Sequence, residues 1–239
     1  MLNPFEQSRL NLKALAANPY PGRGIILGLD ETGKNLIQVY WIMGRSPNSR
    51  NRIFVTDGKG TVSTKPSDPN KVEDASLIIY DAMLQLGSEF AVSNGHQTKD
   101  ILADNPYVLY DNWQYEPDHP NFTPRINGRL DAEELCADLM IMKKSPFSDQ
   151  CNYSTYELDI SVPAVGYCVT TYSGDGNPLP SFAGEPYLLP LEGDIRAVAQ
   201  NIWNSLNEEN RVSLVVKFIA IENWTSTVEI INKYEAVEA

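Results

Sequence analysis

The sequence predicts a mixed α+β domain built from antiparallel strand pairs with covering helices. Two pairs of β-rich segments are joined by short polar turns, one C-terminal segment has a helical apolar period, and no glycine-rich phosphate loop follows a strand. Hairpins mixed with a covering helix favour layered α+β over a doubly wound parallel sheet. The chain has no internal repeat, low-complexity tract or linker, so we expect residues 1–239 to form one domain.

The N-terminal part begins with a weak helix signal and continues into a strand pair. Apolar residues recur at wide spacing before Pro19, which predicts a helix or an arm within residues 1–19. Residues 24–29 and 36–43 are β-rich and predict two strands. The polar turn between them contains Gly33, which suits a hairpin, so we expect the two strands to pair.

The middle of the chain alternates short strands with polar loops. We expect strands at residues 53–55 and 89–93, and a polar loop at 58–71, which is rich in Gly, Pro and Ser. Residues 75–86 are apolar and fit either a helix or a strand. The Asn-Gly pair at 94–95 predicts a turn directly after the second of these strands.

The C-terminal third holds the most regular pattern. Apolar residues recur at helical spacing: Ile195, Val198, Ala199, Ile202, Trp203 and Leu206. They predict an amphipathic helix over 194–206 with Asp194 as its N-cap. Residues 212–221 and 226–231 are β-rich and predict a terminal hairpin. Residues 131–144 are ambiguous, because their acidic start suggests a helix and their apolar second half a central strand.

Charge and hydropathy exclude several classes of partner. The formal net charge is −12, whereas nucleic-acid binding needs a basic face, so we expect no nucleic-acid partner. No run of eighteen apolar residues occurs, and the first residues lack the basic start and apolar core of a signal peptide. We therefore expect a cytoplasmic protein without a membrane partner. The oligomeric state, a homo-oligomer included, stays open.

Cysteine and histidine spacing gives no support for a metal site. Cys136, Cys151 and Cys168 form an odd set without the paired spacing of zinc or redox motifs. We expect each to be a buried structural thiol, because free cysteine is among the most buried residue types. His96 and His119 are not at metal-ligand spacing and lack companion carboxylate or cysteine patterns, so we expect no metal.

A basic segment stands out in this acidic chain. Residues 45–52 contain three of the nine arginines, Arg45, Arg50 and Arg52, and no Asp or Glu occurs in the twenty-five residues 32–56. The segment begins where a predicted strand ends. Two interpretations follow: an exposed turn whose arginines only keep it soluble, or a local site for a small anion.

Polar segments flank several predicted strands, and loops at strand ends are where a rigid scaffold builds a pocket. These segments are residues 20–24, 45–52, 93–98 and 115–125. A Gly-x-Ser-x-Gly sequence does not occur, so the sequence gives no indication of a nucleophile elbow. We expect the polar segments to line a common pocket.

Four motifs within these segments carry a family resemblance. They are Tyr20-x-Gly-Arg23, Gly44-Arg-Ser-x-x-Ser-Arg-Asn-Arg52, Val92-Ser-Asn-Gly-His-x-Thr98 and Thr123-Pro-Arg-Ile126. In this order they resemble the archaeal-type IMP cyclohydrolase family, and residues 166–172 and 178–182 are similar to a longer bacterial branch of it. The resemblance implies a four-layer α/β/β/α sandwich of the N-terminal-nucleophile hydrolase type, without that class's self-processing.

The resemblance also implies a reaction. The family closes the purine ring, converting 5-formamidoimidazole-4-carboxamide ribonucleotide to inosine monophosphate and water, which is the final step of de novo purine biosynthesis. The expected partner is therefore a small purine ribonucleotide. Ring closure requires no redox step or phosphoryl transfer, so we expect no cofactor. It does require a cationic phosphate clamp, a donor for the developing oxyanion and a proton relay.

Site residues follow from the matched motifs. The resemblance implies substrate contacts from Arg23, Arg45, Ser46, Asn48, Asn94, Thr123 and Arg125, and catalytic roles for Arg50, Tyr80 and Glu116. Arg45 and Arg50 would meet phosphate or the oxyanion through their planar forks. Arg52 is assigned to the scaffold, and His96 is given no catalytic role. Asp118 remains the alternative proton relay to Glu116, and either would need a raised pKa to work near neutrality.

Purely structural interpretations of these residues stay open, and so do two other functions. Glu116 alone fits a solvated surface acid, and Tyr80 alone fits a core aromatic residue with a satisfied hydroxyl. One alternative function is an amidohydrolase of the same fold that cuts a C–N amide bond with a self-released N-terminal nucleophile. The other is a purine-nucleotide-binding protein without activity.

Overall fold

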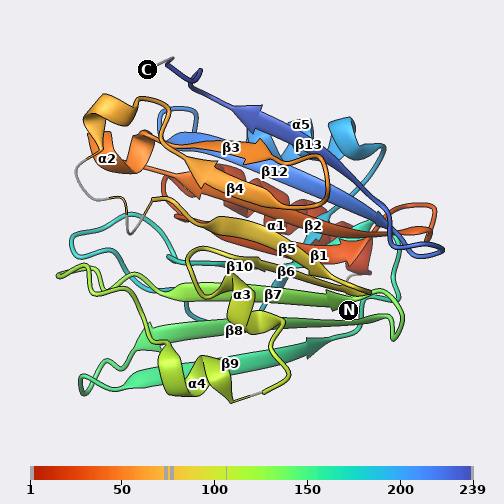
Figure 1. The fold of residues 1–239 in the computed structure, drawn as a ribbon, viewed down its shortest axis with the longest axis horizontal. Helices are drawn as coiled ribbons and strands as arrows, with labels where there is room; N and C mark the ends of the chain where they lie inside the picture. Colours follow the sequence, from red (N-terminus) through yellow and green to blue (C-terminus); the bar gives the residue numbers. More distant parts are fainter. Residues whose placement is uncertain (1–2, 73–74, 76–77, 106, 238–239) are drawn as a thin grey trace.

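Two antiparallel sheets form most of the computed structural model, which describes residues 3–72, 75, 78–105 and 107–237 (Figure 1). The six-stranded sheet has the order β11 (Tyr187–Pro190), β10 (Val165–Thr170), β1 (Gly24–Leu29), β2 (Asn35–Met43), β12 (Arg211–Ala220) and β13 (Ser226–Asn232). The seven-stranded sheet has the order β3 (Ile53–Thr56), β4 (Val62–Lys65), β5 (Asp81–Leu86), β6 (Glu89–Ser93), β7 (Arg125–Asp131), β8 (Cys136–Lys144) and β9 (Cys151–Leu158). The predicted α+β class with antiparallel sheets is confirmed.

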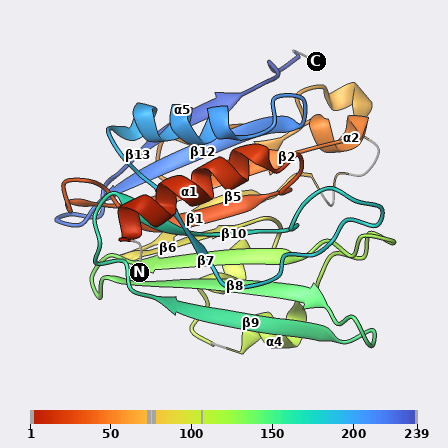
Figure 2. The same ribbon diagram turned by 180° about the vertical axis from the view of Figure 1, so that it is seen from behind.

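Helices lie on the outer faces of both sheets. The helical segments are α1 (Pro4–Ala17), α2 (Pro47–Arg50), η1 (Pro69–Lys71), α3 (Thr98–Ile101), α4 (Val108–Asn112) and α5 (Ile195–Ser205). The two long helices, α1 and α5, cover the six-stranded sheet (Figure 2), where Leu15 and Trp203 pack with Trp41. The short helices α3 and α4 lie over the seven-stranded sheet (Figure 1). No helix in the described part of the chain is long and apolar enough to cross a membrane.

The central strands β1 and β2 of the six-stranded sheet are apolar on both faces. In β1, Ile25 and Leu27 join the core between the sheets, whereas Ile26 joins the cluster under the helices. In β2, Tyr40 faces the core between the sheets and Trp41 faces the helices. Because both faces are buried, these strands read as continuous apolar runs rather than alternating patterns.

Both long helices begin at side-chain caps. Asp194 accepts a hydrogen bond from the backbone N–H of Ala197 at 2.8 Å, which confirms the predicted cap of α5. Asn3 and Glu6 form a reciprocal capping box at the start of α1, so the weak N-terminal signal is a helix. α5 buries Val198, Ala199, Ile202 and Trp203, the apolar face that its period predicted.

The two predicted hairpins are present. β1 pairs with β2 from Gly24 opposite Trp41 to Leu29 opposite Leu36, and Gly33 in their turn has a φ of 70°. This left-handed conformation favours glycine. β12 pairs with β13 in the same antiparallel manner, and β12 also pairs with β2, so the two hairpins lie side by side in one sheet.

Several sequence predictions need correction. The polar loop predicted at 58–71 contains β4, which pairs with β3 through alternating β-branched residues such as Val62 and Thr64. Within the ambiguous segment 75–86 the strand β5 begins at Asp81, while residues 76 and 77 lie outside the described residues. The other ambiguous segment, 131–144, is the end of β7 and the strand β8.

The cysteines differ in exposure. Cys168 is buried in β10, as predicted. Cys136 is exposed and Cys151 is half-buried, so the expectation of three buried thiols is wrong for both. Cys136 begins β8 directly after a turn, and Cys151 begins the edge strand β9, which has a neighbour on one side only. Position in the sheet, rather than residue type, sets their exposure.

The polar segments meet at one end of the two sheets. β1 starts and both β2 and β10 end there, because Gly24 lies opposite Trp41 and opposite Thr170. In the other sheet β6 ends and β7 starts at one end, with Ser93 opposite Asn127. Tyr40 of β2 and Tyr80, which precedes β5, share a hydrogen bond of 2.7 Å across the sheets and tie the two polar ends together.

Candidate functional site

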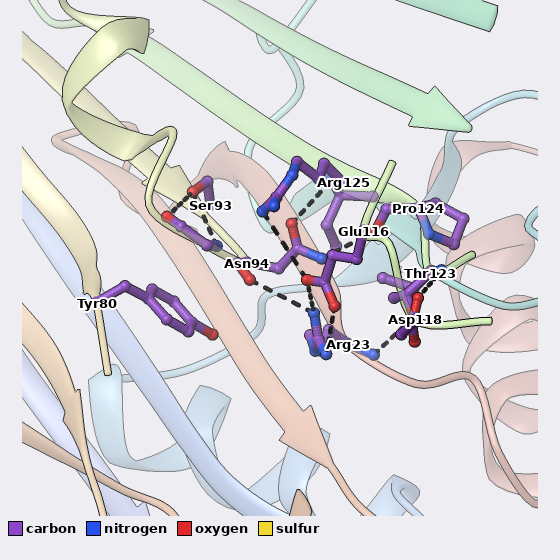
Figure 3. A network of polar contacts seen from close by, with 12 residues as sticks. Arg23, Tyr80, Ser93, Asn94, Glu116, Asp118, Thr123, Pro124 and Arg125 are labelled. Atoms are coloured by element: carbon purple, nitrogen blue, oxygen red, sulfur yellow. Dashed lines mark hydrogen bonds and ion pairs between the residues drawn. The ribbon is translucent and has the colours of Figure 1, made fainter. Parts of the chain in front are cut away.

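A buried carboxylate paired with an arginine lies at this polar end (Figure 3). Nη1 of Arg23 donates to Oε1 of Glu116 at 2.5 Å, and Nη2 donates to Oε2 at 3.3 Å. Arg23 precedes β1 of one sheet, whereas Glu116 lies in the loop before β7 of the other. Burial alone would lower the pKa of Arg23, but the Glu116 carboxylate holds it well above its ordinary value.

Glu116 is held from its backbone as well as its side chain. The residue is 2% exposed, and its backbone N–H donates to the carbonyl of Thr123 at 2.8 Å, which closes the loop 116–123. Placing a carboxylate here costs desolvation energy that the paired arginine must offset. The structure therefore does not support the interpretation of Glu116 as a solvated surface acid.

Arg125 approaches the same carboxylate from β7. Its Nη1 lies 3.9 Å from Oε1 of Glu116 and donates to Oε1 of Gln97 at 3.0 Å. Its Nε donates to the Gln114 carbonyl at 2.9 Å, and its guanidinium stacks 5.0 Å from the centre of the Trp113 ring. Burial lowers the pKa of Arg125 and Glu116 opposes that effect. These contacts leave Arg125 little freedom to move.

The Asn94 side chain holds the turn after β6 against the start of β7. Its Nδ2 donates to the Pro124 carbonyl at 2.9 Å, and its Oδ1 accepts from the backbone N–H of Ile126 at 2.9 Å. Nε2 of Gln97 donates both to Oδ1 of Asn94 and to Oδ1 of Asn127. Asn94 thus positions the loop that carries Arg125, and a substrate contact from its amide would share these bonds.

Asp118 and Thr123 form a second polar pair beside the first. Thr123 donates its backbone N–H to Oδ1 of Asp118 at 2.6 Å and its hydroxyl to Oδ2, and the same hydroxyl lies 2.5 Å from that of Tyr172. Burial raises the pKa of the Asp118 carboxyl, and the hydrogen bonds from Thr123 partly oppose this. A carboxyl with a raised pKa is suited to exchange protons nearer neutral pH.

Tyr80 directs its hydroxyl toward the Arg23–Glu116 pair (Figure 3). The residue is 4% exposed, and its hydroxyl shares a hydrogen bond with that of Tyr40. Burial, followed by the neighbouring Tyr80, raises the pKa of Tyr40 well above its ordinary value. The hydroxyl of Tyr80 is therefore satisfied within the protein, as expected of a core aromatic residue, and its role as a donor to the substrate stays a prediction.

The basic segment divides into an outer and an inner part. The outer part is the short helix α2 with its N-cap Ser46, whose hydroxyl accepts from the backbone N–H of Ser49. Arg45 is exposed, donates to Asp175 and lies 4.9 Å from the centre of the Tyr20 ring. Arg50 donates to the Gly44 carbonyl at 2.9 Å and pairs with Glu209 at 3.5 Å. Both arginines are occupied by the protein itself.

Arg52 is the inner part of the segment. It is 4% exposed, and in the described part of the chain neither its Nε nor its Nη1 has a hydrogen-bond partner. Burial lowers the pKa of Arg52, and the positive charge of Arg23 lowers it further. Asn48 of α2 also has a buried side-chain oxygen without a described partner. An arginine with a purely structural role would be expected to donate hydrogen bonds to neighbouring residues, which Nε and Nη1 of Arg52 do not do among the described residues.

The structure gathers only some of the predicted residues. Hydrogen bonds and ion pairs join Arg23, Asn94, Glu116, Thr123 and Arg125, and Asp118 lies beside them. Tyr80 directs its hydroxyl toward this group (Figure 3). Arg45, Ser46 and Arg50 lie on the outer part of the basic segment, and Asn48 is half-buried there. No cluster of three or more potential metal ligands occurs among the described residues.

Four residues of the site were not singled out from sequence: Tyr40, Gln97, Arg52 as a polar participant, and Tyr172. Gln97 and Tyr172 lie inside quoted motifs, so motif membership was the available signal. For Arg52 the available signal was the alternation of side chains along a strand. Phe54 faces the core between the sheets, and Arg52 precedes it by two residues, so a strand extended by one residue puts both on one face.

Comparison with models of protein families shows which family the chain is similar to. A family model described as IMP cyclohydrolase-like protein matches residues 20–223, which include every residue of the site described above. No curated protein was found to match the sequence.

Proposed function

Because the chain belongs to the IMP cyclohydrolase-like protein family, we propose that it is an IMP cyclohydrolase. The reaction closes 5-formamidoimidazole-4-carboxamide ribonucleotide to inosine monophosphate and water. The observation that carries the proposal is the buried Glu116 carboxylate, which lies between Arg23 and Arg125 inside the matched region. Burying a carboxylate costs desolvation free energy, and a role as proton relay in ring closure would explain why the site contains one.

Ring closure joins two arms of one substrate. The carboxamide nitrogen attacks the formyl carbon, the formyl oxygen gathers negative charge, and that oxygen finally leaves as water after taking up protons. Much of the rate can come from holding the two arms in attack geometry. The remaining tasks are donors for the oxygen and a group that moves a proton from nitrogen to oxygen.

The residues of the site fit these tasks. Glu116 takes the proton from the attacking nitrogen. Asp118 is the alternative relay, because burial raises the pKa of the Asp118 carboxyl. Tyr80 donates to the formyl oxygen, since its hydroxyl is directed toward Glu116 (Figure 3). Arg23 and Arg125 hold the relay and contact the substrate, and Thr123 positions Asp118.

The outer residues of the basic segment have a separate role in the proposal. Arg45, Ser46, Asn48 and Arg50 are predicted to contact the substrate, with Arg50 supporting catalysis at the oxyanion. The free acceptor of Asn48 supports a ligand contact there, since no described residue bonds to it. Arg45 and Arg50 would have to exchange their protein partners for the ligand, Asp175 in one case and Glu209 in the other.

The wider features of the proposal follow the family. We propose a single cyclohydrolase domain of the N-terminal-nucleophile hydrolase type without self-processing, acting in the cytoplasm on a purine ribonucleotide and without a cofactor. The two face-to-face antiparallel sheets with helices on both outer faces support this fold type.

A direct assay tests the proposal. Purified protein is incubated with the formamido ribonucleotide, and inosine monophosphate formation is followed by absorbance. Turnover that is lost in Glu116→Gln supports the relay, whereas turnover unchanged in both Glu116→Gln and Asp118→Asn removes the carboxylate from the mechanism. No turnover by a protein that binds inosine monophosphate would identify a binding protein without activity. Intact mass spectrometry tests the amidohydrolase alternative, which requires a chain shortened by self-processing.

A further inference from the structure

The position of Arg52 is unusual for a buried cation. It lies between the helix α2 and the strand β3, where its backbone carbonyl accepts a hydrogen bond from Ser213 at 3.2 Å. The side chain is almost completely covered, and two of its three nitrogens are buried without a partner in the described residues. Buried arginines are normally paired, because an unpaired charge away from water is strongly unfavourable.

The charges around Arg52 do not balance. Arg23, Arg52 and Arg125 contribute three positive charges at the polar end of the sheets, and Glu116 contributes one negative charge. Asp118 is engaged by Thr123 and forms no described ion pair with an arginine. With the Asp118 carboxylate included, the described residues of this cluster carry three positive charges and two negative ones, so a net positive charge remains. This net charge favours an anionic ligand, and a phosphate monoester carries about two negative charges at neutral pH.

The outer arginines do not offer the same opportunity. Arg45 pairs with Asp175, and Arg50 pairs with Glu209 and bonds to the Gly44 carbonyl. A ligand would have to displace these partners, whereas at Arg52 no described partner has to leave. Unpaired donors in a covered position are also those whose interaction with an anion is least weakened by water.

We propose that Arg52 is the principal residue that binds the phosphate group of the nucleotide substrate. This inference rests on the proposed function for the identity of the nucleotide, but the anion site itself does not. The planar fork of Arg52 provides Nε and Nη1 to two phosphate oxygens, and the neighbouring positive charge of Arg23 strengthens the site. The outer arginines, predicted from sequence to clamp the phosphate, then guide the ligand or hold the loop.

The first experiment measures thermal unfolding with and without inorganic phosphate. In the ligand-free protein we expect Arg52→Met to raise the Tm, because it removes an unpaired buried charge. Phosphate should raise the Tm of the wild type, compared with chloride at equal ionic strength, and should not raise that of Arg52→Met. The control is Arg129→Met, which removes an arginine already paired with Glu89 and should keep the phosphate response.

A structural role predicts the opposite pattern. If Arg52→Met lowers the Tm or fails to fold, Arg52 is part of the scaffold and the inference is wrong. The inference also fails if Arg52→Met folds and keeps the full phosphate response. Arg52→Lys adds a test of geometry, because a point charge without the fork should retain only part of the response.

The second experiment measures binding of inosine monophosphate and of inosine, which lacks the phosphate, by calorimetry. We expect Arg52→Met to bind inosine monophosphate at least about tenfold more weakly and to bind inosine as the wild type does. Arg45→Met and Arg50→Met should lose less. A larger loss in either outer variant would overturn the assignment. An equal loss for inosine would mean that Arg52 contacts the base, and would also overturn it.

The two proposals can fail separately. Wild-type protein that binds phosphate through Arg52 but does not convert the formamido ribonucleotide would disprove the cyclohydrolase and leave the anion site. Protein that turns over normally while Arg52→Met keeps its affinity for inosine monophosphate would disprove the anion site and leave the cyclohydrolase.

Discussion

The outer arginines of the basic segment, Arg45 and Arg50, differ from the inner one, Arg52, in burial and in their protein partners. Arg45 and Arg50 sit at the two ends of the α2 segment, are at least partly exposed, and have acidic or carbonyl partners. Arg52, two residues after Arg50, is almost fully buried and without a described partner for two of its nitrogens. Exposed arginines with protein partners change the stability of the fold little. A buried arginine without a partner destabilises the fold unless a bound ligand neutralises its charge.

This difference teaches that a basic cluster cannot be interpreted as one unit. Within these eight residues, Arg45 precedes the helix α2 and Arg50 ends it, both at least partly exposed, whereas Arg52 lies directly before the strand β3 and is buried. Arginine density locates the segment, but the direction of each side chain decides which arginine meets an anion. The inner region also contains Glu116, so the contrast between inner and outer residues can be tested by activity and by stability.

The largest effect is expected at the inner carboxylate. Glu116→Gln keeps the shape of the side chain but removes its capacity to take a proton, so we expect kcat to fall about 10²- to 10⁴-fold. The matched control is Glu192→Gln, the same change at an exposed acid paired with Arg9, which should leave kcat unchanged. If both variants retain full turnover, the inner region has no special role in the chemistry.

The second largest effect concerns the arginine that pairs with this carboxylate. Arg23→Met leaves Glu116 buried with only the more distant Arg125, so we expect a loss of about 3–5 kcal/mol in the free energy of unfolding. Chemical denaturation measures this loss. In the double variant Arg23→Met/Glu116→Gln the buried charge is also gone, and much of the stability should return. Strictly additive losses would mean that the pair is not energetically coupled.

The fold was predictable from sequence where a period was strong. The pattern of Ile195, Val198 and Ile202 predicted α5, and the paired β-rich runs predicted the hairpins β1–β2 and β12–β13. The strand β4 and the edge strand β9 were not predicted, because short polar strands owe their conformation to pairing with a neighbour. α3 and α4 are one turn long and have no amphipathic pattern to detect.

The candidate site was predictable in membership but not in geometry. The family resemblance singled out Arg23, Glu116 and Arg125. Arg23 lies far from the other two in the chain, and they meet because β1 and β7 begin at the same end of the two sheets. The burial of Arg52 could not be seen in its own motif. It follows from the orientation of β3, and that orientation depends on packing between the two sheets.

Lys217 is a second buried cation, and unlike Arg52 it has a protein partner. Lys217 in β12 is fully covered, but its Nζ donates to the Gly60 carbonyl and lies 6.0 Å from the centre of the Phe90 ring. Burial lowers its pKa to about 8, partly opposed by Asp57. The folded state therefore binds this proton less tightly than the unfolded state does, and the free energy of unfolding should increase as the pH rises from about 8 toward the ordinary lysine value.

Unfolding free energies between pH 7 and pH 10 test this sign. Each unit of pKa difference corresponds to about 1.4 kcal/mol, so the wild type should gain a few kcal/mol relative to Lys217→Met across this range. The difference between the two proteins cancels the titration of other groups. A constant difference would show that Lys217 ionises normally in the folded protein. Added phosphate should not change this difference, in contrast to its expected effect at Arg52.

The smallest effects are expected at the outer arginines. Arg45 and Asp175 are about 39% and 49% exposed in their side chains, and such pairs contribute about 0.2–1 kcal/mol to stability. Arg45→Gln and Arg50→Gln should therefore unfold almost as the wild type does, with any loss reduced further at high salt. If the outer arginines only guide the substrate, both variants should raise KM with little change in kcat, and this increase should shrink as salt is added. The oxyanion role proposed for Arg50 predicts instead that Arg50→Gln lowers kcat while Arg45→Gln does not. A fall in kcat as large as that of Glu116→Gln would instead place the outer arginines at the reacting atoms and remove the distinction between the two regions.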